Sequence, residues 1–120
     1  MTKHIFFLRH FETKNNVNGI LNGQSLEEPI SAGHCIEKCF PFDIIYCSTA
    51  LRCRQTVEWI EGHNKIFFSE QLLERNLGLL EGHSRIEMQK QYPELFDKNR
   101  LNVFATPPEG ESYNEFHGRA

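Results

Sequence analysis

Three short runs of apolar residues predict buried strands in the first 70 residues of the chain. They cover Lys3 to Leu8, Asp43 to Cys47 and Lys65 to Ser69. None of the runs alternates cleanly between apolar and polar positions, which is typical of strands covered on both faces in a parallel sheet. A helix from about Leu51 to Glu61 lies between the second and third runs. The order strand, helix, strand predicts an α/β layer architecture.

Polar residues mark the ends of that helix and a long loop before it. Ser48 or Thr49 can cap the start of the helix, and Gly62 can end it in the left-handed conformation. Residues 14–33 are rich in Asn, Gly, Ser and Pro and predict a loop. Loops of this length in a small domain are usually functional or mobile.

Two capping boxes predict helices in the last third of the chain. Ser84 with Glu87 opens one that Pro93 ends or interrupts, and Ser112 with Glu115 opens another. Eight residues follow Ser112, and so short a helix is marginal unless it is docked. We therefore expect residues 1–120 to be a single domain that is incomplete at its C-terminus.

Composition limits the classes of protein that are possible. A chain of 120 residues with 39% apolar and 24% charged residues suits one soluble domain with one core. The net charge of -3 argues against nucleic acid or an anionic membrane as the main partner. No apolar run approaches the length of a membrane span and no signal-peptide pattern is present, so we expect a cytoplasmic location.

The four cysteines do not form a metal or disulfide pattern. No two of them have Cys-x-x-Cys spacing, and in a reducing compartment such residues are usually buried or half-buried free thiols. They are Cys35, Cys39, Cys47 and Cys53.

Reactive side chains follow the first two predicted strands. Arg9 and His10 end the first run, and Arg52 lies in the first turn of the helix after the second. Ligands of open α/β sheets bind beyond the carboxyl ends of the strands. A guanidinium fork suits phosphate oxygens, and an imidazole can act as a nucleophile. Since an arginine at a helix start opposes the dipole unless an anion lies between them, we expect the three side chains to converge on one anion site.

A carboxylate and a rigid loop complete the set of motifs. Glu74 is followed by Gly78, Glu81 and Gly82, which suggests a turn that presents an acid. Hydrolysis of a phosphate monoester needs a proton for the leaving oxygen, which Glu74 can supply. The run Pro-Pro-Glu-Gly-Glu-Ser at 107–112 then leads into the last helix cap.

Together these motifs resemble the histidine phosphatase (phosphoglycerate mutase-like) superfamily and occur in its order. One match would be weak, whereas four in sequence, from Lys3 to Arg119, are highly specific. The resemblance implies a three-layer α/β/α fold with a mostly parallel sheet, lacking the family's C-terminal strands and helix. The motifs are Leu8-Arg9-His10-x-Glu12-Thr13, Ser48 with Leu51-Arg52 and Gln55-Thr56, Leu73-Glu74 with Gly78 and Glu81-Gly82, and Pro108-x-Gly110-Glu111-Ser112.

The same resemblance implies a role for each site residue. His10 is the phosphoryl acceptor, Arg9 and Arg52 bind the phosphate, and Glu74 acts as general acid and then base. Asn16 matches an asparagine that often reaches the phosphate. The family uses no metal or organic cofactor for this chemistry. We therefore expect a phosphatase that hydrolyses small phosphate monoesters through a phosphohistidine, with a small phosphorylated substrate as its partner.

Two alternative functions stay open. A phosphoglycerate mutase-type phosphotransferase is less favoured, because the longer insertion that those enzymes carry after the Glu motif is missing. Glu81-Gly82 also resembles the phosphatase branches, whereas the mutases usually have Gln-Gly there. A non-catalytic family member would keep the anion site and bind phosphorylated ligands without turnover.

Three departures from the family pattern bear on activity. Phe11 stands where Gly or Ala is usual, so its ring either narrows the pocket or turns into the core. The segment from Gly33 to Phe42 is shorter than the family's helix at that place. The second catalytic histidine of the family has no match, since none of the others ends an apolar strand before a glycine. Those others are His4, His34, His63, His83 and His117.

The missing histidine belongs to a strand that lies in the middle of the family's sheet. Its loss would leave strand edges unpaired, and such edges favour self-association. The chain is then a fragment of a longer enzyme, a naturally shortened member, or half of a site that another chain completes.

Overall fold

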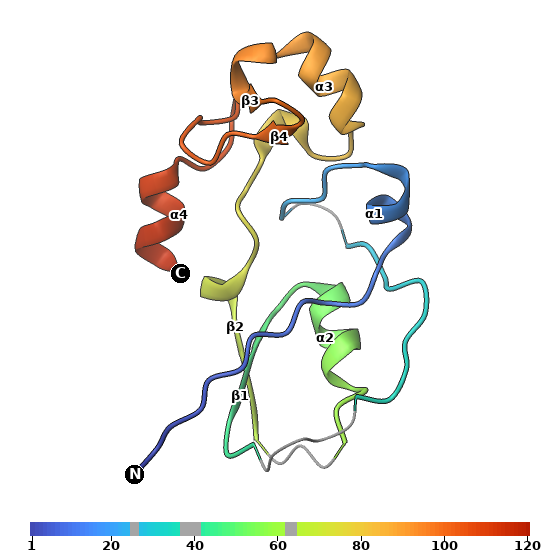
Figure 1. The fold of residues 1–120 in the computed structure, drawn as a ribbon, viewed down its shortest axis with the longest axis vertical. Helices are drawn as coiled ribbons and strands as arrows, with labels where there is room; N and C mark the ends of the chain where they lie inside the picture. The colour runs from blue at the N-terminus through green and yellow to red at the C-terminus, as the bar shows by residue number, and fades with distance from the viewer. Residues whose placement is uncertain (25–26, 37–41, 62–64) are drawn as a thin grey trace.

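The chain between Ile45 and Ser69 folds as strand, helix and strand, as predicted (Figure 1). The computed structural model describes residues 1–24, 27–36, 42–61 and 65–120. β1 (Ile45–Ser48) and β2 (Ile66–Ser69) pair in parallel, with Ile45 opposite Ile66, and α2 (Leu51–Val57) connects them. A parallel pair requires such a crossover. The α/β class with a parallel sheet is therefore confirmed.

α2 begins at the predicted residue and ends before the predicted one. The predicted cap by Ser48 or Thr49 is wrong, because Ala50 is the N-cap residue and no side chain caps the helix. The Oγ of Ser48 instead accepts a hydrogen bond from the amide of Ala50 at 3.3 Å. The helix stops at Val57 because Ile60 forms a bridge with Ile36, whose amide donates to the carbonyl of residue 59 at 2.8 Å. The predicted C-terminal Gly62 lies outside the described residues.

The prediction of a strand at Lys3 to Leu8 is wrong. The segment is extended but pairs with no strand in the described part of the chain. Its apolar side chains are exposed, Ile5 to 80% and Phe7 to 96%. An apolar run becomes a strand only when a neighbouring strand pairs with it, and none of β1 to β4 does so here. The segment still leads Arg9 and His10 to the region where α2 begins (dark blue in Figure 1).

The predicted loop at 14–33 contains one short helix. The side chains of Thr13 and Asn16 form a capping box that starts α1 (Lys14–Asn18), and Gly19 ends it in the left-handed conformation. The loop prediction is wrong for this turn, because Asn at the third helical position can cap the backbone as Glu or Gln does.

The second half of the chain builds a unit of short helices around a hairpin. The predicted helix α3 ends at Gln91, before Pro93. Its expected capping box is wrong, because Ser84 makes no side-chain cap and pairs through its backbone with Ile20. The elements are η1 (Glu70–Leu72), η2 (Gly78–Leu80), α3 (Arg85–Gln91), η3 (Pro93–Leu95), β3 (Phe96–Asp97), β4 (Arg100–Leu101) and α4 (Tyr113–Arg119).

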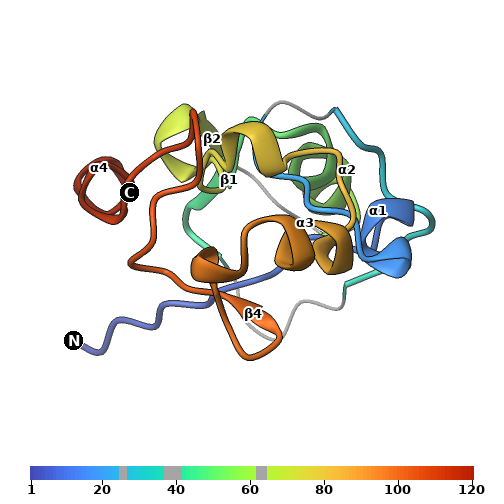
Figure 2. The same ribbon diagram turned by 90° about the horizontal axis from the view of Figure 1, so that it is seen from above.

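α4 forms as its capping box predicts. Ser112 Oγ accepts from the amide of Glu115, whose carboxylate accepts from the amide of Ser112. Seen from above, the helix lies at the outer side of the molecule next to η1 (Figure 2). Its C-terminal Arg119 donates to the carbonyl of Gln71 at 2.8 Å, so the helix is docked.

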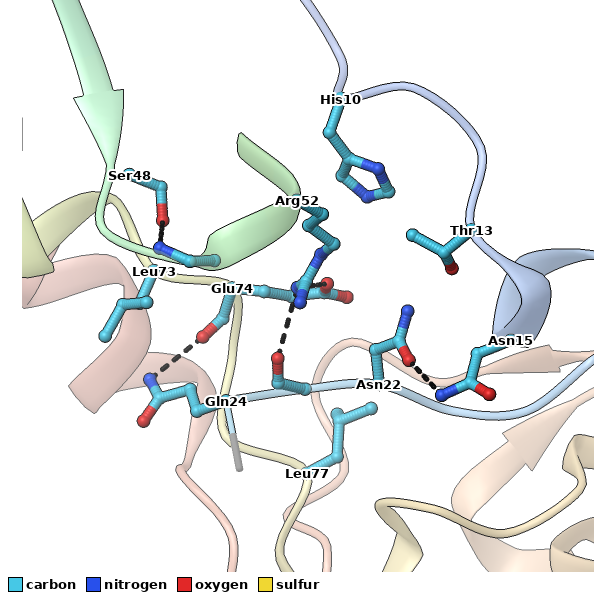
Figure 3. A network of polar contacts seen from close by, with 12 residues as sticks. His10, Thr13, Asn15, Asn22, Gln24, Ser48, Arg52, Leu73, Glu74 and Leu77 are labelled. Carbon is cyan, nitrogen blue, oxygen red and sulfur yellow. Dashed lines mark hydrogen bonds and ion pairs between the residues drawn. The ribbon is translucent and has the colours of Figure 1, made fainter. Parts of the chain in front are cut away.

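Buried apolar side chains form two clusters within the described residues. One joins α2 to β1 through Cys47, Val57 and Ile60. The other lies under α3 and includes Leu77, Leu80, Met88 and Leu95. Residues 73–76 connect β2 and η1 to the second cluster, and they pass the start of α2 on the way (Figure 3).

A close approach of two loops next to the second cluster requires a glycine. Gly78 has φ +55°, and a Cβ there would collide with the carbonyl oxygen of Pro108. That carbonyl accepts a hydrogen bond from the amide of Leu79 at 2.9 Å. The third and fourth motifs therefore touch at Gly78.

The described cysteines differ in exposure. Cys47 is buried and Cys53 is half-buried, as expected, whereas Cys35 is exposed, which corrects that part of the prediction. Cys35 belongs to an irregular segment outside both apolar clusters, which explains its exposure. Cys39 and residues 37–41 of the shortened segment lie outside the described residues. No helix in the described ranges is long and apolar enough to cross a membrane.

Candidate active site

His10 presents one ring nitrogen for reaction. Its Nδ1 lies 2.6 Å from the backbone oxygen of Phe11. A carbonyl oxygen can only accept, so Nδ1 carries the proton and Nε2 keeps the lone pair. Figure 3 shows the imidazole facing the side on which Arg52 and Asn22 lie. The backbone therefore fixes the tautomer that a nucleophilic histidine needs.

The surroundings of His10 favour the neutral imidazole. Burial lowers the pKa of His10 below its ordinary value, and the positive charges of Arg52 and Arg9 lower it further. The hydrogen bond to Phe11 and the charge of Glu74 act in the opposite direction. Because only the neutral ring has a free lone pair, a lowered pKa keeps the nucleophile competent at and below neutral pH.

A chain of hydrogen bonds ties the N-terminal segment to α2. The amide of Phe11 donates to Thr56 Oγ1 at 2.9 Å, and that hydroxyl donates to the carbonyl of Arg52 at 2.7 Å. The ring of Phe11 lies against His34, with the ring centroids 4.8 Å apart. These contacts place His10 next to Arg52 although the expected strand before it is absent.

Arg52 is a buried cation with an unused donor. The residue is 2% exposed, and its Nη2 donates to the carbonyl of Gly23 at 3.2 Å and to Glu74 Oε2 at 3.0 Å. Its Nε is buried and finds no hydrogen-bond partner among the described residues. An unsatisfied buried donor on a charged group costs about 1–3 kcal/mol or more. An anion oxygen at this position would remove that penalty.

Glu74 reaches Arg52 from the irregular segment between η1 and η2. Its side chain is 51% exposed, and its only described ion pair is the contact with Arg52. The backbone carbonyl of Glu74 accepts from Gln24 Nε2 at 2.9 Å. The half-exposed carboxylate thus contacts the buried guanidinium (Figure 3).

The two other predicted site residues lie at the margin of this group. Arg9 is exposed, and its charge acts on His10. Asn16 uses its side-chain oxygen to accept from the amide and hydroxyl of Thr13, both at 3.0 Å. The amide nitrogen of Asn16 is the part that can serve a phosphate oxygen.

Sequence reasoning missed Asn22 and Gly23. Asn22 is 6% exposed, and its Oδ1 accepts from Asn15 Nδ2 at 2.8 Å, which turns its own amide nitrogen toward the side of His10 and Thr13 (Figure 3). Gly23 has φ +62°, and a Cβ there would overlap the carboxylate of Glu81. The dipeptide Asn-Gly is a turn signal, which is the feature that could have drawn attention to it.

The described residues contain no group of three or more His, Cys, Asp or Glu side chains placed to hold a metal ion. The site as described consists of an imidazole with a lowered pKa, a buried guanidinium and a carboxylate. The imidazole can attack, the guanidinium can hold an anion, and the carboxylate can exchange a proton. This combination suits transfer of a phosphoryl group.

Comparison with known proteins agrees with this geometry. The model of the histidine phosphatase superfamily (branch 1) matches residues 5–120, and the chain belongs to that family. A broad-specificity phosphatase of Saccharomyces cerevisiae is 30% identical over 96% of this chain and 54% of its own. The chain spans about half the length of the curated relatives that it matches.

Solved structures share the fold. A phosphoglycerate mutase from Thermus thermophilus matches with a TM-score of 0.67 and 28% identity, covering 92% of this chain and 64% of that one. An α-ribazole phosphatase from Shigella flexneri matches with a TM-score of 0.75 and 23% identity, covering 93% and 60%. These likenesses confirm the phosphoglycerate mutase-like fold class.

Proposed function

We propose that this chain supplies the phosphoryl-transfer residues of a phosphatase that hydrolyses small phosphate monoesters through a phosphohistidine at His10. The observation that carries the proposal is the buried Nε of Arg52, which has no hydrogen-bond partner among the described residues and lies on the side faced by a neutral imidazole. A buried cation with an unused donor next to a nucleophile favours an anionic substrate. The relative named as a broad-specificity phosphatase supports the same reaction class.

In the first step, His10 Nε2 attacks phosphorus while the nonbridging oxygens contact Arg52, Arg9 and the amide nitrogen of Asn16. The bond from phosphorus to the ester oxygen breaks, and that oxygen takes the proton of the Glu74 carboxyl. The positive charge that develops on the imidazole is stabilised by the Nδ1–H bond to Phe11.

In the second step, water hydrolyses the phosphohistidine. Glu74, now a carboxylate, takes a proton from the water as its oxygen attacks phosphorus. The bond from Nε2 to phosphorus breaks, which releases inorganic phosphate and restores neutral His10. A bound phosphoryl group contacts the unused Nε of Arg52, while Glu74 keeps its place next to Nη2.

The test compares ester classes in the variant Glu74→Gln. General acid catalysis contributes about 100-fold to 10,000-fold where the leaving group is poor. We expect a loss of about that size in kcat/KM for alkyl phosphates, and a much smaller loss for p-nitrophenyl phosphate, whose leaving group needs no proton. Glu70→Gln, at an exposed carboxylate of η1, is the matched control and should behave as the unchanged protein.

Two results would overturn the proposal. Equal loss on both ester classes would show that Glu74 does not act as the acid. Turnover that survives in His10→Ala would exclude the histidine as the acceptor. Transfer of phosphate to an added alcohol phosphate in preference to water would instead favour the mutase-type reaction.

A further inference from the structure

The segment that carries Glu74 has no regular structure of its own. Residues 73–77 run between η1 and η2 without a sheet or helix to satisfy their backbone groups. Such a segment is positioned by the groups that bind its amides and carbonyls, which include Gln24 Nε2 at the carbonyl of Glu74 and the backbone amide of Glu111 at the carbonyl of Asn76. The side chains of Glu111 and Arg119, near the end of the chain, also bind this segment. The sequence motifs assign neither residue a role in the reaction.

Arg119 binds the backbone on both sides of Glu74. Its Nη1 donates to the carbonyls of Gln71 at 2.8 Å and Leu73 at 2.9 Å, and its Nη2 donates to the carbonyl of Glu74 at 3.0 Å. Its Nε and Nη2 also donate to the two oxygens of Glu111 at 2.7 and 3.0 Å. A guanidinium has five N–H donors, and these five bonds use all of them.

Glu111 binds the backbone on the C-terminal side of Glu74. Its Oε2 accepts from the amide of Asn76 at 3.0 Å, and its side chain is 13% exposed. The hydrogen bond from Arg119 is the main reason that the pKa of Glu111 lies below its ordinary value. The pair therefore holds the carbonyl of Glu74 and the amide two residues later.

Both partners of this contact are held by further hydrogen bonds. Arg119 ends α4, whose start is fixed by the Ser112 capping box. The backbone of Glu111 bonds Arg75 Nε at 2.9 Å and the carbonyl of Asn76 at 2.8 Å. A shift of the pair would move the backbone at Glu74, and with it the carboxylate that meets Arg52.

We propose that Glu111 and Arg119 are positioning residues that hold Glu74 at the distance from Arg52 and His10 that proton transfer requires. The inference rests on the proposed function and extends it to two residues that touch neither substrate nor reacting atoms. The proposal requires that substitution of Glu111 or Arg119 slow protonation of the leaving oxygen by Glu74 more than it slows the rest of the reaction. A role confined to holding α4 in place would impair every substrate alike.

The kinetic test uses the leaving-group dependence that reports on Glu74. Misplacement of a catalytic group by about 1 Å can cost about 100-fold. We expect Arg119→Gln and Glu111→Gln to lower kcat/KM for alkyl phosphates about 10-fold to 100-fold more than for p-nitrophenyl phosphate. Arg119→Lys should recover part of that difference, and Arg100→Gln, at an exposed residue of β4, should show none.

The proposal also predicts how the effects of two substitutions on kcat/KM combine. In a Glu74→Gln background, Arg119→Gln should cause no further loss on alkyl phosphates, since the group that it positions is already gone. Equal losses on both ester classes, or full additivity with Glu74→Gln, would overturn the proposal. If Arg119→Gln does not fold, Glu111→Gln takes both tests. Failure of both variants to fold would establish a structural role and overturn it as well.

A second measurement separates this inference from the proposed function. The NMR signals of the Arg52 Nη2–H groups, one of which donates to Glu74 Oε2, report on this contact without requiring turnover. We expect Arg119→Gln and Glu111→Gln to shift these signals and Arg100→Gln to leave them unchanged. An unmoved signal contradicts the positioning role. A shifted signal in a protein that hydrolyses no ester supports the positioning role and contradicts the proposed function.

Discussion

At the scale of single residues, the site depends on how two side chains are paired. The Nδ1–H of His10 is held by a backbone carbonyl, which leaves Nε2 for reaction. Arg52 is buried with its Nε unpaired among the described contacts, although its Nη2 donates to Gly23 and Glu74. Burial lowers the pKa of His10 and the nearby Arg52 cation lowers it further, so Arg52 favours the neutral imidazole.

The lowered pKa of His10 predicts the acid limb of the pH profile. Below its pKa the imidazole is protonated and cannot attack, so kcat/KM falls as the pH falls through that value. We expect the limb to lie below pH 6.5, the ordinary value for histidine. Arg52→Gln removes a cation that lowers this pKa, so the limb should move to higher pH. A profile of kcat/KM against pH measures both.

The control for this profile is Arg100→Gln, which removes an exposed cation remote from the described site contacts and should leave the limb in place. An acid limb above pH 6.5 in the unchanged protein would contradict the environment described for His10. So would a limb that Arg52→Gln moves to lower pH.

The residues of the site divide into those the sequence could predict and those it could not. His10, Arg52 and Glu74 belong to sequence motifs that predict their place in the site, and the structure brings them together. Arg119 acts through a distant segment, since it binds a carbonyl 45 residues away, and Asn22 is oriented by Asn15 across the turn of α1. Such pairing depends on how loops approach one another, which local pattern does not encode.

At the scale of elements, the short helix α4 holds part of the site in place. α4 has seven residues and is marginal by itself, yet it ends in the arginine that binds the backbone at Glu74. Its capping box and the five hydrogen bonds of Arg119 hold its two ends. Loss of the cap should therefore affect the position of the backbone at Glu74.

Removal of the cap gives a prediction for stability. Ser112→Ala leaves the amide of Glu115 without its acceptor, which should lower the free energy of unfolding by about 1 kcal/mol. The matched control is Ser31→Ala at an exposed loop residue, where we expect little change. Urea denaturation of the two variants measures the difference. Equal stability of the two would contradict the account of α4.

The elements also show what an apolar pattern can and cannot predict. The runs at β1 and β2 formed strands because each has the other as a partner. The run at Lys3 to Leu8 has the same pattern but pairs with none of the strands β1 to β4. An apolar pattern indicates which faces of a segment can be buried, whereas strand pairing depends on the rest of the molecule.

At the scale of the whole molecule, the chain exposes more surface than a compact domain of its size. Its accessible surface is 8621 Å², whereas a folded protein of 14.0 kDa typically exposes about 6,700 Å². Its radius of gyration is 16.0 Å, against about 14 Å for a compact chain of this length. Part of the excess is apolar and includes Ile5, Phe7 and Tyr46.

This exposed apolar surface predicts that residues 1–120 alone associate with further copies. Edges and apolar patches of this kind favour pairing between chains. Sedimentation velocity should show a mass that rises with concentration, and Phe7→Asp should reduce the effect. Phe104→Asp, at a residue also exposed but remote from that segment, is the control. A monomer at every concentration would contradict this expectation.

The most direct test of the central claim is to locate the phosphoryl group on the protein. After brief incubation with a labelled phosphate monoester and an alkaline quench, we expect acid-labile, base-stable phosphate on His10. It should be bonded to Nε2, because Nδ1 is engaged with the carbonyl of Phe11. Mass spectrometry gives the residue, and ³¹P NMR gives the nitrogen. Phosphate on another residue, phosphate on Nδ1, or turnover without any labelled histidine would contradict the account.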